Sequence, residues 1–151
     1  MKRAPRSPRL VRGSRLVALV PLVLAAAVTA APARAAAPTV GDVWAGEVAA
    51  RTARLSGEVV RDPTLVGRYH FNLISAAAYA LNQDAGKDPF AGALTLPPLD
   101  VQVAAGTGAV TVSQPASNLQ PQTAYRYRLV VSNASGTANG ATHSLATWLR
   151  A

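Results

Sequence analysis

The chain has 151 residues, no Cys, eight aromatic side chains and a formal net charge of +8. This length suits one domain of ordinary size with a short additional segment. The absence of Cys excludes disulfide bonds, Cys-ligated zinc and thiol chemistry. The positive charge alone would favour a nucleic-acid or membrane-surface partner, so its distribution along the chain decides how it is interpreted.

The first 35 residues have the layout of a secretory signal peptide. Six basic residues within positions 2–15 precede an apolar run over residues 16–28, and small residues follow. Ala33 and Ala35 fit the A-x-A rule for signal peptidase, so we expect cleavage after Ala35 or within a few residues of it. A retained membrane anchor is the alternative, but the apolar run is shorter than the roughly 20 residues that span a bilayer. The sequence therefore predicts a signal peptide over residues 1–35 and a secreted, extracellular protein.

Removing this segment removes most of the positive charge. Seven of the 15 basic residues lie in it, which leaves eight basic and seven acidic residues and a net charge of about +1. Nucleic-acid binding needs Lys and Arg clustered in the folded domain. The charge distribution therefore argues against a nucleic-acid partner, and a membrane is expected to be contacted only through the signal peptide before cleavage.

In the remaining sequence, apolar and polar residues alternate with a period of two. Residues 36–42 are predicted to be a short linker, residues 75–81 an irregular crossover or a short helix, residues 82–98 the longest loop, and residues 133–140 a turn. Six short strands are predicted between and around these segments, at residues 44–48, 52–60, 68–74, 107–114, 123–132 and 141–148. Six or seven short strands with turns between them predict an all-β fold, a two-sheet antiparallel β-sandwich over residues 43–149.

One late segment resembles a known family. Residues 119–137 carry a Leu-x-Pro-x-Thr-x-Tyr-x-Tyr-x-Leu pattern followed by Asn-x-x-Gly-Thr, and residues 52–59 and 69–71 are similar to the opening strands of the same family. The pattern resembles bacterial fibronectin type III domains, and the resemblance covers most of residues 43–149. It implies an immunoglobulin-like sandwich. The middle of the chain, around residues 72–80, departs from the family.

The same resemblance implies a structural role for four residues. A Tyr two residues after a Thr at the start of a strand can return its hydroxyl to the preceding backbone, in the arrangement called a tyrosine corner. Pro presets φ in the preceding segment, and a Leu beside it fills the core. The residues of this predicted tyrosine corner are Leu119, Pro121, Thr123 and Tyr125.

No catalytic, metal or cofactor site is predicted. His70 and His143 have no Cys, His, Asp or Glu at the spacing of metal ligands. Ser144 adjoins His143, but neighbouring strand residues point to opposite faces. Residues 82–88 contain two Asp, but Lys87 interrupts any calcium-loop pattern. Asn133-Ala134-Ser135 matches a glycosylation acceptor, and a turn is the favoured explanation.

The aromatic residues leave two functions open. Trp44 and Trp148 lie near the two ends of the predicted sandwich, where they either cover its edge or, together with Tyr79 or Phe90, form a stacking platform for sugar rings. We expect a secreted, non-catalytic fibronectin type III-like module that mediates extracellular protein interaction or spacing. The alternative is a cell-wall or carbohydrate-binding module, so the expected partner is an extracellular protein or a cell-wall polysaccharide.

Overall fold

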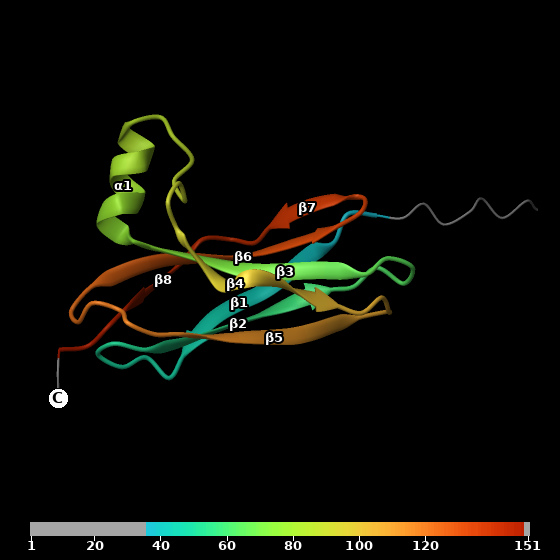
Figure 1. Cartoon of the computed structure of the whole chain (residues 1–151), viewed down its shortest axis with the longest axis horizontal. Coiled ribbons are helices and arrows are strands. Elements are labelled where there is room, and N and C mark those ends of the chain that lie inside the picture. The colour runs from blue at the N-terminus through green and yellow to red at the C-terminus, as the bar shows by residue number, and fades with distance from the viewer. Residues whose placement is uncertain (1–35, 150–151) are drawn as a thin grey trace, which may run out of the picture. The chain divides into compact units, whose positions relative to one another are not determined.

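A computed structural model describes residues 36–149, and the predicted signal peptide with Ala33 and Ala35 lies outside these residues. The described segment contains eight strands and one helix (Figure 1). In chain order they are β1 (Thr39–Gly46), β2 (Ala53–Val60), β3 (Gly67–Ser75), α1 (Ala76–Asp84), β4 (Leu94–Val103), β5 (Ala109–Ala116), β6 (Ala124–Asn133), β7 (Gly136–Asn139) and β8 (His143–Ala146).

The strands form two antiparallel sheets packed face to face. One sheet has the order β1-β2-β5. The other has the order β4-β3-β6-β7, and β8 pairs with β6 beyond the end of β7. Figure 1 shows the two sheets as layers, with α1 standing at one end of the larger sheet. The predicted two-sheet antiparallel β-sandwich is confirmed.

Alternating apolar residues build the core between the sheets. On β3, Tyr69, Phe71 and Leu73 are buried, as the period-two pattern predicts. Gly57 on β2 is required by close packing, because a Cβ there would lie 2.8 Å from Cδ2 of Leu129. The core cluster consists of Val43, Ala53, Leu55, Val59, Tyr69, Phe71, Leu73, Val103, Val112, Ala116, Leu119, Tyr127, Leu129, Val131 and Leu145.

The segment predicted as the longest loop contains the start of a strand that the sequence did not reveal. β4 begins at Leu94, which pairs with Leu73, and continues through Leu96, which pairs with Phe71. Two prolines, Pro97 and Pro98, follow within the strand, and the Leu96–Pro97 bond is cis. Proline cannot donate to a strand ladder and is confined to edges and bulges. β4 is an edge strand with an irregular register against β3, so it tolerates residues that would exclude a central strand.

Two further boundaries differ from the predictions. β1 begins at Thr39, inside the predicted linker over residues 36–42, because Thr39 and Val40 pair with the end of β2 across a register shift. The predicted turn over residues 133–140 contains the short strand β7. Gly140 separates β7 from β8, and a Cβ there would lie 2.8 Å from Cγ1 of Val40. The Gly-, Asn- and Ser-rich composition of this segment therefore predicted a turn where a short strand pairs with β6.

The turn after β2 is organised by Asp62. Its Oδ1 atom accepts hydrogen bonds from the N–H of Thr64 (2.7 Å), the hydroxyl of Thr64 (2.7 Å) and the N–H of Leu65 (2.9 Å). The side-chain and backbone hydrogen bonds from Thr64 are the main cause that lowers the pKa of Asp62 to about 2 from its ordinary value of 3.8. Asp62 is therefore an ionised carboxylate throughout the ordinary pH range.

Replacing Asp62 with Asn is expected to reduce the acid sensitivity of the fold. A carboxyl whose pKa is lower in the folded than in the unfolded state stabilises the fold above pH 3.8, and this contribution is lost as the pH falls through about 2. In urea unfolding, the difference in the free energy of unfolding between the wild type and D62N should shrink as the pH falls from 6 to 2. D42N, at an exposed position on β1, is the control and should follow the wild type. Parallel pH profiles for the wild type and D62N would contradict the prediction.

Candidate functional site

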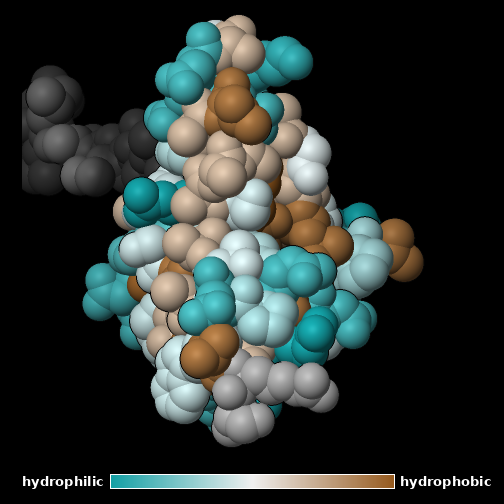
Figure 2. Space-filling model, turned by 90° about the vertical axis from the view of Figure 1, so that its left-hand side faces the viewer, coloured by the Kyte–Doolittle hydropathy of each residue, from teal (hydrophilic) through white to brown (hydrophobic). Residues whose placement is uncertain are grey.

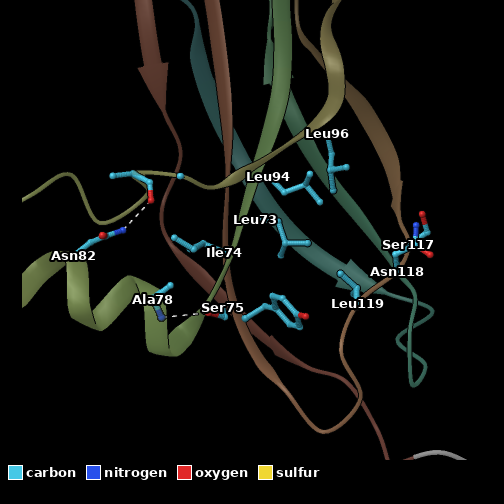
Figure 3. A pocket seen from close by; sticks show the side chains of 13 residues that line it. Leu73, Ile74, Ser75, Ala78, Asn82, Leu94, Leu96, Ser117, Asn118 and Leu119 are labelled. Carbon is cyan, nitrogen blue, oxygen red and sulfur yellow. Dashed lines mark hydrogen bonds between the residues drawn. The ribbon is translucent and has the colours of Figure 1, made fainter.

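A groove opens between α1 and one end of the sandwich. Its volume is about 610 Å³, and it is bounded by α1, by the segment that leads into β4 and by the loop between β5 and β6. Figure 3 shows the leucines of this groove between the helix and the loop that carries Ser117 and Asn118. The lining residues are Leu73, Ile74, Ser75, Ala78, Asn82, Ala91, Gly92, Leu94, Leu96, Ser117, Asn118, Leu119 and Tyr125.

Local capping explains why α1 forms where it does. Ser75 ends β3 in an extended conformation, and its hydroxyl oxygen accepts a hydrogen bond of 3.2 Å from the N–H of Ala78. The Ala-rich residues that follow have high helix propensity. The helix ends at Asp84, and Gly86 adopts a positive φ of 66° just after it. The short helix left open by the sequence is therefore real, although it extends three residues further than expected. Among the described residues, no helix is both long and apolar enough to cross a membrane.

Asn82 fixes the loop that returns from α1 to the sheet. Its side-chain amide donates hydrogen bonds to the carbonyl oxygens of Pro89 (3.1 Å) and Ala91 (2.9 Å). Figure 3 shows Asn82 on the helix side of the groove with one of these bonds drawn. Because these two bonds hold the loop against the helix, the wall of the groove is preformed.

Aromatic and charged side chains fasten the same loop to the larger sheet. Phe90 is only 6 % exposed, and its ring contacts that of Tyr79 edge to face with 5.3 Å between centroids. The guanidinium carbon of Arg128 lies 4.3 Å from the centroid of Phe90, and Nη2 of Arg128 lies 3.7 Å from a carboxylate oxygen of Asp88. The Nε atom of Arg128 is buried and has no hydrogen-bond partner within the described part of the chain. Tyr79 and Phe90 therefore help to hold α1 and its return loop on the larger sheet, and Phe90 presents little of its ring to solvent.

The groove combines an apolar floor with polar, uncharged edges. None of the lining residues is charged at neutral pH. The floor is formed by the buried side chains of Leu73 and Leu119, and the polar groups around it are hydroxyls and amides. Residues 36–149 contain no group of three or more His, Asp and Glu side chains that could hold a metal ion. Such a groove can take an uncharged, mostly apolar ligand and form hydrogen bonds with its polar edges.

The four residues of the predicted tyrosine corner lie together at the edge of this groove. The hydroxyl of Tyr125 accepts a hydrogen bond of 2.8 Å from the N–H of Gln120. The hydroxyl of Thr123 donates to the carbonyl oxygen of Pro121 at 2.9 Å, and Leu119 is buried in the core. Leu119 and Tyr125 both line the groove, so this arrangement also shapes the candidate site.

Thr147, which the sequence analysis did not single out, completes the same segment. It is 4 % exposed, and its hydroxyl lies 2.6 Å from the carbonyl oxygen of Gln120 and accepts a hydrogen bond of 2.9 Å from the N–H of Thr123. Gln120 is therefore held through its N–H by Tyr125 and through its C=O by Thr147. No local motif reveals this role, because Thr147 lies 27 residues beyond Gln120 in the chain.

The two tryptophans are exposed but lie apart from the other predicted stacking residues. Trp44 is 42 % exposed, on the outer face of the smaller sheet opposite Ser56. Trp148 is 65 % exposed and follows β8, where its N–H donates to the carbonyl oxygen of Ala49 at 3.3 Å. Among the described residues, neither tryptophan ring contacts another aromatic ring. The structure thus divides the four predicted aromatics into two exposed tryptophans and one packed pair.

Solved structures similar to this one contain fibronectin type III domains. The FN1–FN3 domains of chicken CNTN1 match with a TM-score of 0.51 and 20 % identity, over 74 % of this chain and 32 % of that chain. An FN3 domain of human collagen XX matches with a TM-score of 0.46 and 20 % identity, over 78 % and 99 % of the two chains. The sensor domain of the anti-sigma factor RsgI4 from Pseudobacteroides cellulosolvens matches with a TM-score of 0.47 and 15 % identity, over 74 % and 92 %.

No protein-family model and no curated protein matches the sequence. At these levels of identity, the likeness to chicken CNTN1 shows the fold alone. The architecture is a fibronectin type III-like, immunoglobulin-like β-sandwich with α1 and its return loop inserted between β3 and β4.

Proposed function

We propose that the protein is an exported, non-catalytic module that binds another extracellular protein through the groove beside α1. One observation carries this proposal: large apolar side chains are exposed around an uncharged groove. Leu94 at the start of β4 lines the groove and is 50 % exposed, and Leu81, which lies on α1 outside the lining, is 68 % exposed. Figure 2, which faces this end of the sandwich, shows hydrophobic surface on the α1 lobe and in the hollow below it. Contiguous exposed apolar surface bordered by polar groups is typical of interaction sites.

The lining favours a protein segment as the occupant. Leucines dominate the floor, and Tyr125 is the one aromatic residue among the lining residues. Sugar rings are usually held by aromatic faces, whereas aliphatic side chains pack against other aliphatic side chains. The hydroxyls and amides at the edge can bond to the main chain of a bound segment. We therefore expect an uncharged, apolar segment of a protein partner.

The surroundings of the histidines support a non-catalytic role. Nδ1 of His70 lies 2.9 Å from a carboxylate oxygen of Asp100, and the ring of His143 packs against that of Tyr127 with 5.8 Å between centroids. Neither histidine lines the groove. A general base must reach the substrate it serves, so these side chains are not placed to act on a molecule bound there.

The exposed tryptophans support one alternative function. Trp44 and Trp148 present rings to solvent and could stack on a polysaccharide without using the groove. This alternative predicts binding that depends on Trp148 or Trp44 and is indifferent to Leu94. The two functions are therefore separable by variants.

Replacing Leu94 with Arg is expected to weaken binding of a protein partner strongly. A charged side chain at the groove mouth would have to be desolvated when an apolar segment binds, so at least a tenfold loss is expected. The exported protein is immobilised and exposed in parallel to total secreted protein from the producing cells and to insoluble cell-wall polysaccharide. Bound proteins are identified by mass spectrometry, and the affinity of each is then measured with the purified partner.

Matched variants decide between the outcomes. Leu99, on the same strand, is 83 % exposed and does not line the groove, so L99R adds the same charge and should bind normally. Equal losses in L94R and L99R would contradict the groove as the binding site. Retention on the polysaccharide, lost in W148A or W44A and kept in L94R, would establish the alternative.

A further inference from the structure

Ala36, the first described residue, is held through both of its main-chain polar groups. Its N–H lies 3.1 Å from Oδ2 of Asp62, and its carbonyl oxygen accepts a hydrogen bond of 2.9 Å from the side-chain amide of Asn133. The two partners come from the turn after β2 and from the end of β6. The exposed backbone at Ala36 is therefore fixed by two side chains remote from it in sequence.

Asp62 offers Ala36 an anionic oxygen that no cationic side chain occupies. Its other oxygen, Oδ1, is used by Thr64 and Leu65, and its own carbonyl oxygen accepts a hydrogen bond of 2.9 Å from the N–H of Gly106. The adjacent Arg61 directs its guanidinium to the carbonyl oxygen of Thr107 at 2.7 Å. Among residues 36–149, Asp62 forms no ion pair with Lys, Arg or His. The carboxylate is therefore held in place and ionised, and within the described residues it has no counter-charge.

Asn133 is also held in place by hydrogen bonds from both atoms of its side-chain amide. Its Oδ1 atom accepts hydrogen bonds from the N–H groups of Ser135 (2.8 Å) and Gly136 (3.1 Å), and its amide nitrogen donates to Ala36. This side chain therefore shapes the turn between β6 and β7 and holds the carbonyl group of Ala36 with the same amide group. The role agrees with a turn at Asn133-Ala134-Ser135, because the side-chain oxygen of Asn133 accepts hydrogen bonds from the N–H groups two and three residues further on.

We propose that signal peptidase cleaves the bond between Ala35 and Ala36, and that the α-ammonium group formed on Ala36 pairs with the carboxylate of Asp62. The cleavage rests on the proposed export and on Ala33 and Ala35, which match the small-residue rule. Water supplies a hydroxyl to the carbonyl carbon of Ala35 and a proton to the nitrogen of Ala36. That nitrogen binds a further proton from solvent and becomes a cation.

The position of the cut matters because consecutive Cα atoms are about 3.8 Å apart. Cleavage one residue earlier would move the charge away from Asp62 by about that distance, and cleavage one residue later would remove the carbonyl group that Asn133 holds. At the proposed bond, a neutral N–H donor 3.1 Å from the carboxylate is replaced by a cationic one. Processing would thus add an ion pair that the precursor lacks.

The first part of the test locates the cut. The full chain is expressed in a bacterium that exports proteins by the general route, and the intact mass of the protein recovered outside the cells is measured. A mass that begins at Ala36 is expected. Any other starting residue would overturn the proposed cleavage, whereas retention of the full-length chain inside the cells would contradict export itself.

The second part tests the ion pair independently of export. Residues 36–151 contain the complete hydrophobic core, which extends from Val43 to Leu145, and they are released from a fusion with either a free or an acetylated α-amino group. An exposed ion pair stabilises a fold only modestly, so at pH 6 the free form should melt about 1–4 °C higher. Asp62 and Arg61 are the charged side chains that line the surface around Ala36 in the described structure.

The pH dependence gives the sharpest readout. The ordinary pKa of an α-amino group is about 7.7–8.0, and pairing with a carboxylate raises it. The difference between free and acetylated forms should therefore be complete below about pH 7.5 and disappear as the pH rises through the raised pKa. In D62N the two forms should melt alike at every pH, whereas D42N should keep the wild-type difference. Equal effects of acetylation in the wild type and in D62N, or none in either, would overturn the ion pair.

Discussion

Replacing Phe71 with alanine is expected to lower the free energy of unfolding by about 3–5 kcal/mol. The side chain is completely buried at the centre of β3, and its ring is nearly perpendicular to that of Tyr69, with 6.2 Å between centroids. Truncation removes the apolar area that Phe71 buries and leaves a cavity that the two sheets can only partly fill. Because native domains are stable by only about 5–15 kcal/mol, this one change removes a large share of the total.

Urea unfolding followed by tryptophan fluorescence or circular dichroism measures this effect. The control is L99A on neighbouring β4, where the side chain is 83 % exposed and the expected change is within about 0.5 kcal/mol. If F71A and L99A unfolded at the same urea concentration, the arrangement of the core described above would be wrong.

Replacing Thr147 with valine is expected to lower the free energy of unfolding by about 1–3 kcal/mol, although the side chain keeps nearly the same shape. The hydroxyl accepts from the N–H of Thr123 and donates to the carbonyl oxygen of Gln120, and valine leaves both groups without this partner. Thr147 itself is buried and both hydrogen bonds are partly buried, so water replaces the lost hydroxyl only incompletely at these two groups. The exposed Thr137 on β7 offers a matched control, since T137V makes the same chemical change where water can replace the hydroxyl.

Thr147 and Tyr125 are expected to act together. Y125F alone should lower the free energy of unfolding by about 0.5–1.5 kcal/mol, which is less than the effect of T147V. The N–H of Gln120, which loses its partner in Y125F, is exposed and can bind water instead. Both variants release the same peptide segment, so the double variant should be less destabilised than the sum of the two single ones. Strict additivity in urea unfolding would show that the two hydroxyls hold the segment independently.

The central strands could be predicted from sequence because burial on one face imposes alternation. Tyr69, Phe71 and Leu73 on β3 and Tyr127, Leu129 and Val131 on β6 all follow this rule. The start of β4 was not predicted because β4 is an edge strand, where prolines are tolerated and most side chains are exposed. Its pattern carries little of the signal on which the prediction depends.

The groove itself could not be predicted from sequence. It forms where Ala78, Leu94 and Asn118 approach one another, and none of these residues is distinctive alone. Nor could the sequence show that Phe90 would be buried against Arg128 while Trp148 stayed exposed. Local patterns report the periodicity of an element, whereas these placements depend on how an insertion folds back onto a sheet.

The attachment of α1 has an evolutionary consequence. The chain leaves the larger sheet after Ser75 and returns at Leu94, which pairs directly with Leu73 on the neighbouring strand. The insertion therefore starts and ends at adjacent rungs of one ladder, as a simple hairpin turn would, and no residue of the helix itself is buried. Its length and sequence can change while the strand register beneath it is preserved. The architecture thus leaves α1 and its return loop outside the pairing that sets the strand register, so changes in this insertion would not require redesign of the sandwich.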